Sequence, residues 1–250
     1  MEFTLGGHDA PERILRNEPR GRTTVRALIK LMYSTGLLLL LSGSTSAQTS
    51  EFLLSKVAQK IVYDEFGDPT APTCLILLHG ASGPHVLLYR DQAAFFAAHG
   101  YRVLLPHYFD ATRSTDPTTE NYIRWSNLVP DFAAECRSKA PERKVFVLGL
   151  SLGASVALAA GSQGAPVDAI AEWYGSLPDD FFHRFISMPR LLILHGGMDT
   201  NIPISNGQQL VQLCGIKQLS CDYHFYPDQG HGFSGKALGD ADQRTLAFFR

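Results

Sequence analysis

Residues 144–153 read KVFVLGLSLG, an apolar run that ends in a serine between two glycines. This is the G-x-S-x-G pattern of a nucleophile elbow, in which a strand turns sharply into a helix and presents the serine at the turn. Glycine suits positions 149 and 153 because the crowded turn leaves little room for a Cβ atom. Small helix-forming residues follow and end at Gly161. The stretch therefore predicts a strand, a turn and a helix, with Ser151 as a catalytic nucleophile; a merely structural turn is the alternative.

The composition is that of a globular chain with one core. Its 250 residues are 45% hydrophobic and carry a formal net charge of -2. A chain of this length and type commonly forms a single α/β domain, which we place at residues 51–250. No cluster of lysine and arginine occurs beyond the N-terminal segment, so we expect no nucleic-acid partner.

The N-terminal leader, residues 1–47, has a different character. Basic residues up to Lys30 precede a short apolar run over residues 31–41, and small polar residues follow. This layout is typical of a secretory signal, which we assign to residues 26–47 with cleavage near Ala47. The apolar run is shorter than the roughly twenty residues that a membrane-spanning helix needs. We expect export to the periplasm or the exterior with no membrane span after processing; a membrane tether or a misassigned start is the alternative.

The cysteines leave two interpretations open. Cys214 ends an expected helix and Cys221 begins the next expected strand, so a short bridge between them suits an oxidising compartment. The alternative is that all four, with Cys74 and Cys136, are buried thiols that pack as small hydrophobes.

Short apolar runs alternate with helical segments after residue 50. This alternation predicts an α/β fold with an open, mostly parallel sheet covered by helices on both faces. The expected strands are 57–64, 73–79, 101–106, 144–150, 167–174, 190–195 and 220–226. The expected helices are 88–99, 120–138, 152–162, 204–214 and 239–250.

A serine nucleophile needs a histidine base and an acid that orients the base. On this type of fold the chain order is serine, acid, histidine. Asp199 follows the strand 190–195, and His231 lies in a glycine-lined loop after the strand 220–226, so these two residues are our choices. Asp228 and Asp179 are competing acids, but Asp228 is too near His231 in sequence and Asp179 precedes the expected strand.

Backbone amides should stabilise the oxyanion that forms during attack. One is that of Leu152, the residue after the nucleophile, and the other should come from the loop after the strand 73–79. We choose Ala81 in that loop, with Ser82 as the second choice. His79 and His195 both end an apolar strand and precede a glycine, where we expect them to organise loops by hydrogen bonding.

Five motifs follow one another along the chain: HGASG at 79–83, GYRVLLP at 100–106, GLSLG at 149–153, HGGMD at 195–199 and YPDQGHGF at 226–233. Through these motifs, in this order, the chain from residue 57 onward resembles the dienelactone hydrolase branch of the α/β-hydrolases. The resemblance implies the α/β-hydrolase fold and a triad of Ser151, Asp199 and His231. The namesake enzymes carry cysteine as the nucleophile and a further glycine after the motif, where this chain has Ser151 and Ala154. For the arginines that hold the carboxylate of the namesake substrate, the nearest candidate here is Arg113, and a solvated loop arginine is the preferred interpretation of this residue.

The sequence therefore predicts a serine hydrolase that cleaves carboxylic esters or lactones through an acyl-enzyme, with a small-molecule substrate and no metal or organic cofactor. The alternatives are a serine peptidase, an acyltransferase, or a binding protein that keeps the pocket without catalysis. Glu172 lies on an expected strand beside Trp173, where it could hydrogen-bond near the nucleophile. No lid-sized insertion is visible, which favours small or extended substrates.

Overall fold

The computed structural model describes residues 49–54 and 59–250, so the expected leader lies outside the described residues. Within this part, eight strands form one sheet in the order β1-β2-β4-β3-β5-β6-β7-β8. The six strands from β4 to β8 in that order are mutually parallel, whereas β1 and β2 are antiparallel to their neighbours. The bounds are β1 Thr49–Leu54, β2 Lys60–Phe66, β3 Thr73–Leu78, β4 Tyr101–Pro106, β5 Lys144–Leu150, β6 Ala169–Trp173, β7 Arg190–Gly196 and β8 Cys221–Tyr226.

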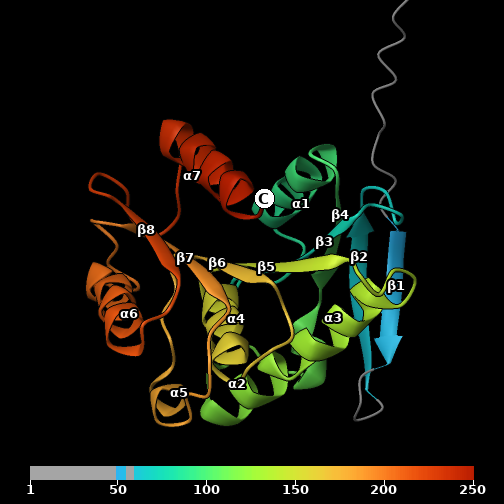
Figure 1. The fold of residues 1–250 in the computed structure, drawn as a ribbon, viewed down its shortest axis with the longest axis horizontal. Coiled ribbons are helices and arrows are strands. Elements are labelled where there is room, and N and C mark those ends of the chain that lie inside the picture. The colour runs from blue at the N-terminus through green and yellow to red at the C-terminus, as the bar shows by residue number, and fades with distance from the viewer. Residues whose placement is uncertain (1–48, 55–58) are drawn as a thin grey trace, which may run out of the picture. The chain divides into compact units, whose positions relative to one another are not determined.

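Helices cover both faces of the sheet (Figure 1). One face carries α1 (Leu87–Ala98) and α7 (Gly235–Phe248). The other carries α2 (Thr119–Ser126), α3 (Leu128–Arg137), α4 (Leu152–Ser162), α5 (Asp179–His183) and α6 (Ile204–Lys217). A 3-10 turn, Tyr108–Ala111, follows β4. Each face has its own hydrophobic cluster, so the predicted α/β fold with a mostly parallel sheet is confirmed.

The central strands are apolar along their whole length because both of their faces are covered. In β3 the side chains of Leu75 and Leu77 pack on the side of α1 and α7, and that of Ile76 packs on the side of α4. This alternation is the period-two pattern of a strand, and burial on both faces turns it into a continuous hydrophobic run. Parallel strands place their carboxyl ends at one edge of the sheet, where ligands of such folds bind.

The expected single helix over residues 120–138 is wrong, because the structure has two helices there. α2 ends at Ser126 and α3 begins at Leu128. Pro130 explains the break, since proline has no N–H to bond to the carbonyl of residue 126 and its ring would clash with that carbonyl. In the first turn of α3 the same residue is tolerated. The strand β1, the short helix α5 and the 3-10 turn were not predicted.

All four cysteines form disulfides, so the interpretation as free buried thiols is wrong. Cys214 at the end of α6 pairs with Cys221 at the start of β8, as one of the two expectations had it. Cys74 on β3 pairs with Cys136 on α3, which fastens this helix to the sheet. Across residues 49–54 and 59–250 the structure contains no helix with the length and hydropathy needed to span a bilayer.

Candidate active site

The strand β5 turns into α4 at Ser151, which has a backbone φ of 55° and ψ of -121°. Few non-glycine residues adopt a positive φ, and such strain is common at functional sites. The flanking glycines are required by crowding. A Cβ at Gly153 would lie 2.5 Å from the His79 carbonyl oxygen, and one at Gly149 would lie 2.5 Å from Ala154 Cα. The expected strand, turn and helix are therefore confirmed, and the serine lies at the carboxyl edge of the sheet.

The structure brings Ser151, His231 and Asp199 into one hydrogen-bond chain. The Ser151 Oγ lies 2.7 Å from His231 Nε2, and His231 Nδ1 lies 2.8 Å from Asp199 Oδ2. A carboxylate only accepts, so the imidazole proton sits on Nδ1 and Nε2 is free to accept the serine proton. The competing acids Asp228 and Asp179 are exposed to solvent.

The Asp199 carboxylate is fully buried and fixed at both oxygens. Oδ1 accepts hydrogen bonds from the amides of Asn201 and Ile202, each at 2.9 Å, which leaves Oδ2 for His231. His195 closes the same loop, because its Nε2 donates to the Ile202 carbonyl at 2.8 Å. Burial lowers the pKa of His195, so its ring is neutral and serves as a structural donor.

The loop after β3 borders the serine. A Cβ at Gly80 would lie 3.3 Å from Ser151 Cβ, so this backbone passes directly beside the nucleophile candidate. Ala81 is the next residue in the loop, and Leu152 is the first residue of α4. His79 holds the loop by donating from Nδ1 to the Gly80 carbonyl at 2.8 Å. Burial lowers the pKa of His79 to about 3, so this ring stays neutral, and the expectation that His79 and His195 organise loops is confirmed.

Two tyrosines lie at this edge. The sequence places Tyr174 in an aromatic segment expected either near the mouth of the site or in the core, whereas Tyr89 was not predicted as part of the site. The Tyr174 ring lies edge-on to His231 with the centroids 5.1 Å apart, and its own backbone φ is 46°. Tyr89 of α1 is buried with its hydroxyl against Gly80. Tyr174 directly follows a parallel strand, and that position is the signal for its place beside His231. Tyr89 lies within a helix, and nothing in its sequence surroundings marks it.

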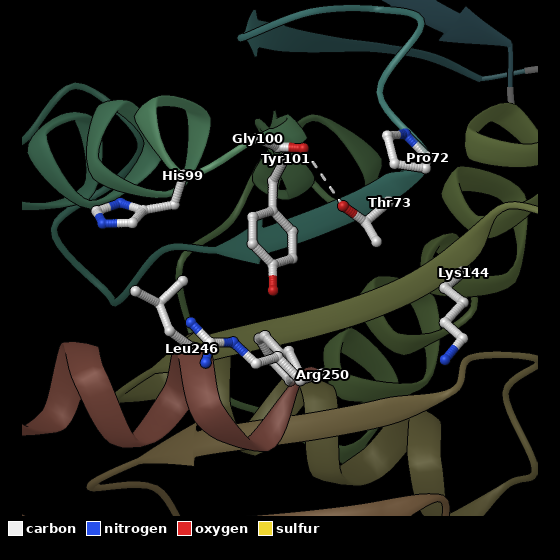
Figure 2. Close-up of a pocket in the computed structure, with 9 residues that line it drawn as sticks. Pro72, Thr73, His99, Gly100, Tyr101, Lys144, Leu246 and Arg250 are labelled. Carbon is white, nitrogen blue, oxygen red and sulfur yellow. Dashed lines mark hydrogen bonds between the residues drawn. The ribbon is translucent and has the colours of Figure 1, made fainter.

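One pocket in the described part of the chain lies away from the residues around Ser151. It has a volume of about 700 Å³ and is lined by Thr73, Tyr101 and Lys144, the first residues of β3, β4 and β5, together with the end of α7. In Figure 2 the ring of Tyr101 lies in its middle, with His99 and Lys144 at opposite sides. Because it opens at the amino ends of the strands, this pocket is at the opposite edge of the sheet from Ser151. Among the described residues, no group of three or more His, Cys, Asp or Glu side chains is placed to hold a metal ion.

A mostly parallel sheet with a strained serine after β5, and an acid and a histidine after β7 and β8, defines the α/β-hydrolase class. Comparison with known proteins identifies the family. The family model of the dienelactone hydrolases matches residues 66–246, and the chain therefore belongs to the dienelactone hydrolase family. The resemblance inferred from the five motifs is confirmed.

Solved structures with the same fold include esterases. The esterase Pf2001 of Pyrococcus furiosus superposes with a TM-score of 0.66 at 16% identity, over 81% of this chain and 92% of that one. The serine hydrolase XC6422 of Xanthomonas campestris, described as lacking a lid, gives a TM-score of 0.63 at 15% identity, over 80% and 93% of the two chains. A Methylorubrum extorquens protein provisionally named carboxymethylenebutenolidase is 26% identical over 109 residues, which are 40% of this chain and 38% of that relative. The matched segment therefore spans well under half of this curated relative.

Proposed function

We propose that this hydrolase is a serine enzyme that cleaves carboxylic esters or lactones through an acyl-enzyme, with Ser151 as the nucleophile. The hydrogen-bond chain from Ser151 through His231 to Asp199 carries the proposal. As the serine oxygen attacks the carbonyl carbon, His231 Nε2 takes its proton and then gives it to the leaving alcohol. Water attacks the acyl-enzyme in the second half of the cycle, with His231 again as the base, and the serine is regenerated.

Asp199 acts on the histidine alone. Its buried carboxylate holds the proton on Nδ1 and stabilises the imidazolium that forms at each proton transfer. We assign the oxyanion hole to the backbone amides of Leu152 and Ala81. Leu152 begins α4, so its amide adds the partial positive charge of a helix N-terminus, and the loop of Ala81 passes beside the serine.

The nucleophile favours ordinary esters over the namesake substrate. The enzymes that gave the family its name use a cysteine where this chain has Ser151. Ester hydrolysis as the reaction is therefore better supported than dienelactone as the substrate. The connection between β6 and β7 holds only the short helix α5 as regular structure. A segment of that size leaves the site open, which suits small or extended substrates.

Turnover of small aryl esters by Ser151→Ala tests the proposal. We expect the activity to fall by about 10⁴-fold or more while the melting temperature stays close to that of the wild type. Ser138→Ala is the matched control, because Ser138 is exposed and directly follows the last residue of α3. Retained activity in Ser151→Ala would overturn the assignment. A panel of esters, lactones and peptides then separates the esterase from a peptidase, and added alcohol acceptors reveal an acyltransferase.

We also propose that the mature protein is exported. The signal-like segment 26–47 and the pairing of all four cysteines in disulfides both support an oxidising destination. N-terminal mass analysis of the protein from an extracytoplasmic fraction should give a start near residue 48. Recovery of the uncleaved chain from the cytoplasm would contradict export.

A further inference from the structure

The residues at the end of β6 contact two members of the proposed triad and the strand that leads to the third. The Trp173 carbonyl accepts a hydrogen bond from the Ser151 amide at 3.0 Å, and the Tyr174 amide donates to the Leu194 carbonyl at 2.8 Å, on the strand that leads to Asp199. The Tyr174 ring faces the His231 imidazole. One short turn therefore borders the serine, the histidine and the strand that leads to the acid.

A single carboxyl group closes this turn. Glu172 Oε2 accepts a hydrogen bond from the Gly175 amide at 2.8 Å, which spans the left-handed Tyr174. A Cβ at Gly175 would lie 2.5 Å from Ala154 Cβ and 3.1 Å from Glu172 Oε2. Gly175, which the carboxyl group holds, thus lies against the first turn of α4, directly after the nucleophile.

Glu172 is out of place as a core residue. It is fully buried on the face of the sheet that also packs Ile170, and its Oε1 has no hydrogen-bond partner among the described residues. Burial raises its pKa to about 8, so the group is mostly uncharged at neutral pH. Burying a polar group with one unpaired oxygen is costly, and an apolar side chain would fill this core position at less cost.

We propose that Glu172 is a positioning residue, whose carboxyl group holds the turn after β6 and thereby the Tyr174 ring against His231. The inference rests on the proposed hydrolysis at Ser151. Because Glu172 is fully buried, its proposed role is to act through Tyr174 on the orientation of the imidazole and not through contact with substrate. A reacting group displaced by about 1 Å can lose about 10²-fold in rate, so a small movement of the ring is enough to matter.

Four variants test the chain of contacts. Glu172→Gln keeps an acceptor for the Gly175 amide at the same size, and Glu172→Ala removes it. Tyr174→Leu keeps an apolar side chain but removes the aromatic ring that faces His231. Asp242→Ala is the matched control, because Asp242 is also a buried carboxyl with a raised pKa but lies on α7, against the other face of the sheet.

We expect kcat for a small aryl ester to fall by about 30-fold or more in Glu172→Ala and in Tyr174→Leu, with KM within about threefold of the wild type. A double variant that combines Glu172→Ala with Tyr174→Leu should lose no more kcat than the worse of the two single variants, because both remove the same contact with His231. Glu172→Gln should recover kcat to within about fivefold, and Asp242→Ala should leave kcat unchanged.

Three results would overturn the positioning role: full kcat in Tyr174→Leu, losses that multiply in the double variant, or equal losses in Glu172→Gln and Glu172→Ala. If Glu172→Ala does not fold, Tyr174→Leu and Glu172→Gln decide the question. Labelling of wild-type Ser151 by a fluorophosphonate keeps this outcome separate from the proposed function. An unlabelled wild type refutes the hydrolase mechanism, whereas a labelled wild type with unaffected variants refutes only the role of Glu172.

Discussion

Glu172→Gln should remove a pH-dependent loss of stability from this protein. The carboxyl is fully buried, and burial raises its pKa from the ordinary value of 4.5 to about 8. Below pH 4.5 the folded and unfolded chains both hold the proton, so folding is independent of this group. Between pH 4.5 and about 8 the unfolded chain releases the proton while the folded chain keeps it, and the unfolded state is favoured increasingly as the pH rises. Above pH 8 both states are ionised and the penalty stays constant.

The size of the effect follows from the width of that pH window. Each pH unit contributes about 1.4 kcal/mol, so the full penalty is on the order of 5 kcal/mol at pH 9 relative to pH 4.5. Glutamine does not titrate and carries no such penalty. The stability of Glu172→Gln relative to the wild type should therefore increase steadily with pH and level off above pH 8.

Urea unfolding from pH 5 to pH 9 measures this difference. Both tryptophans, Trp125 and Trp173, are fully buried, so their fluorescence reports loss of the core. Asp242→Asn is a useful second variant, because its raised pKa of about 6 places its own transition at lower pH. A stability difference between Glu172→Gln and wild type that stays constant across this range would refute the assignment of a buried, un-ionised carboxyl.

Three further predictions concern the site and its scaffold. Asp199→Asn should lower kcat by about 10⁴-fold in steady-state ester hydrolysis, because the amide no longer holds the proton on the histidine Nδ1. Gly153→Ala should lower the melting temperature by about 10 °C in calorimetry, since its Cβ would overlap the Leu78 carbonyl oxygen; an unchanged value would refute the crowding at the elbow. Replacing Cys74 and Cys136 with alanine should cost about 4 kcal/mol in urea unfolding, because their disulfide closes a loop with a sequence separation of 62 residues; the shorter-range disulfide should cost about 2 kcal/mol.

Most of the fold was predictable because its signals are local. The strands Tyr101–Pro106 and Lys144–Leu150 and the helix Leu152–Ser162 were predicted at their observed bounds, since apolar runs and glycines delimit each of them. The division between α2 and α3 was missed, although Pro130 is the physical cause of the break. The strand β1 was missed because it is an edge strand defined by its pairing with β2, and pairing is not a local property.

In the candidate site, too, the features with local sequence signals were predictable and those that depend on packing were not. Ser151, Asp199 and His231 each follow a strand at the carboxyl edge of a parallel sheet, so motif and chain order were enough to bring them together. The contact of Tyr174 with His231 depends on a positive φ and on a buried carboxyl two residues earlier. No sequence pattern carries those features, because they arise when β6 is packed between two other strands.

The central claim is that Ser151 forms a covalent acyl-enzyme. Mass spectrometry after treatment with a fluorophosphonate, followed by peptide mapping, tests it most directly, with p-nitrophenyl acetate turnover measured on the same sample. The account predicts one adduct per chain, on the peptide that contains Ser151, a parallel loss of turnover, and no adduct in Ser151→Ala. Full loss of turnover with the adduct on another residue, or turnover that persists after Ser151 is fully modified, would contradict it.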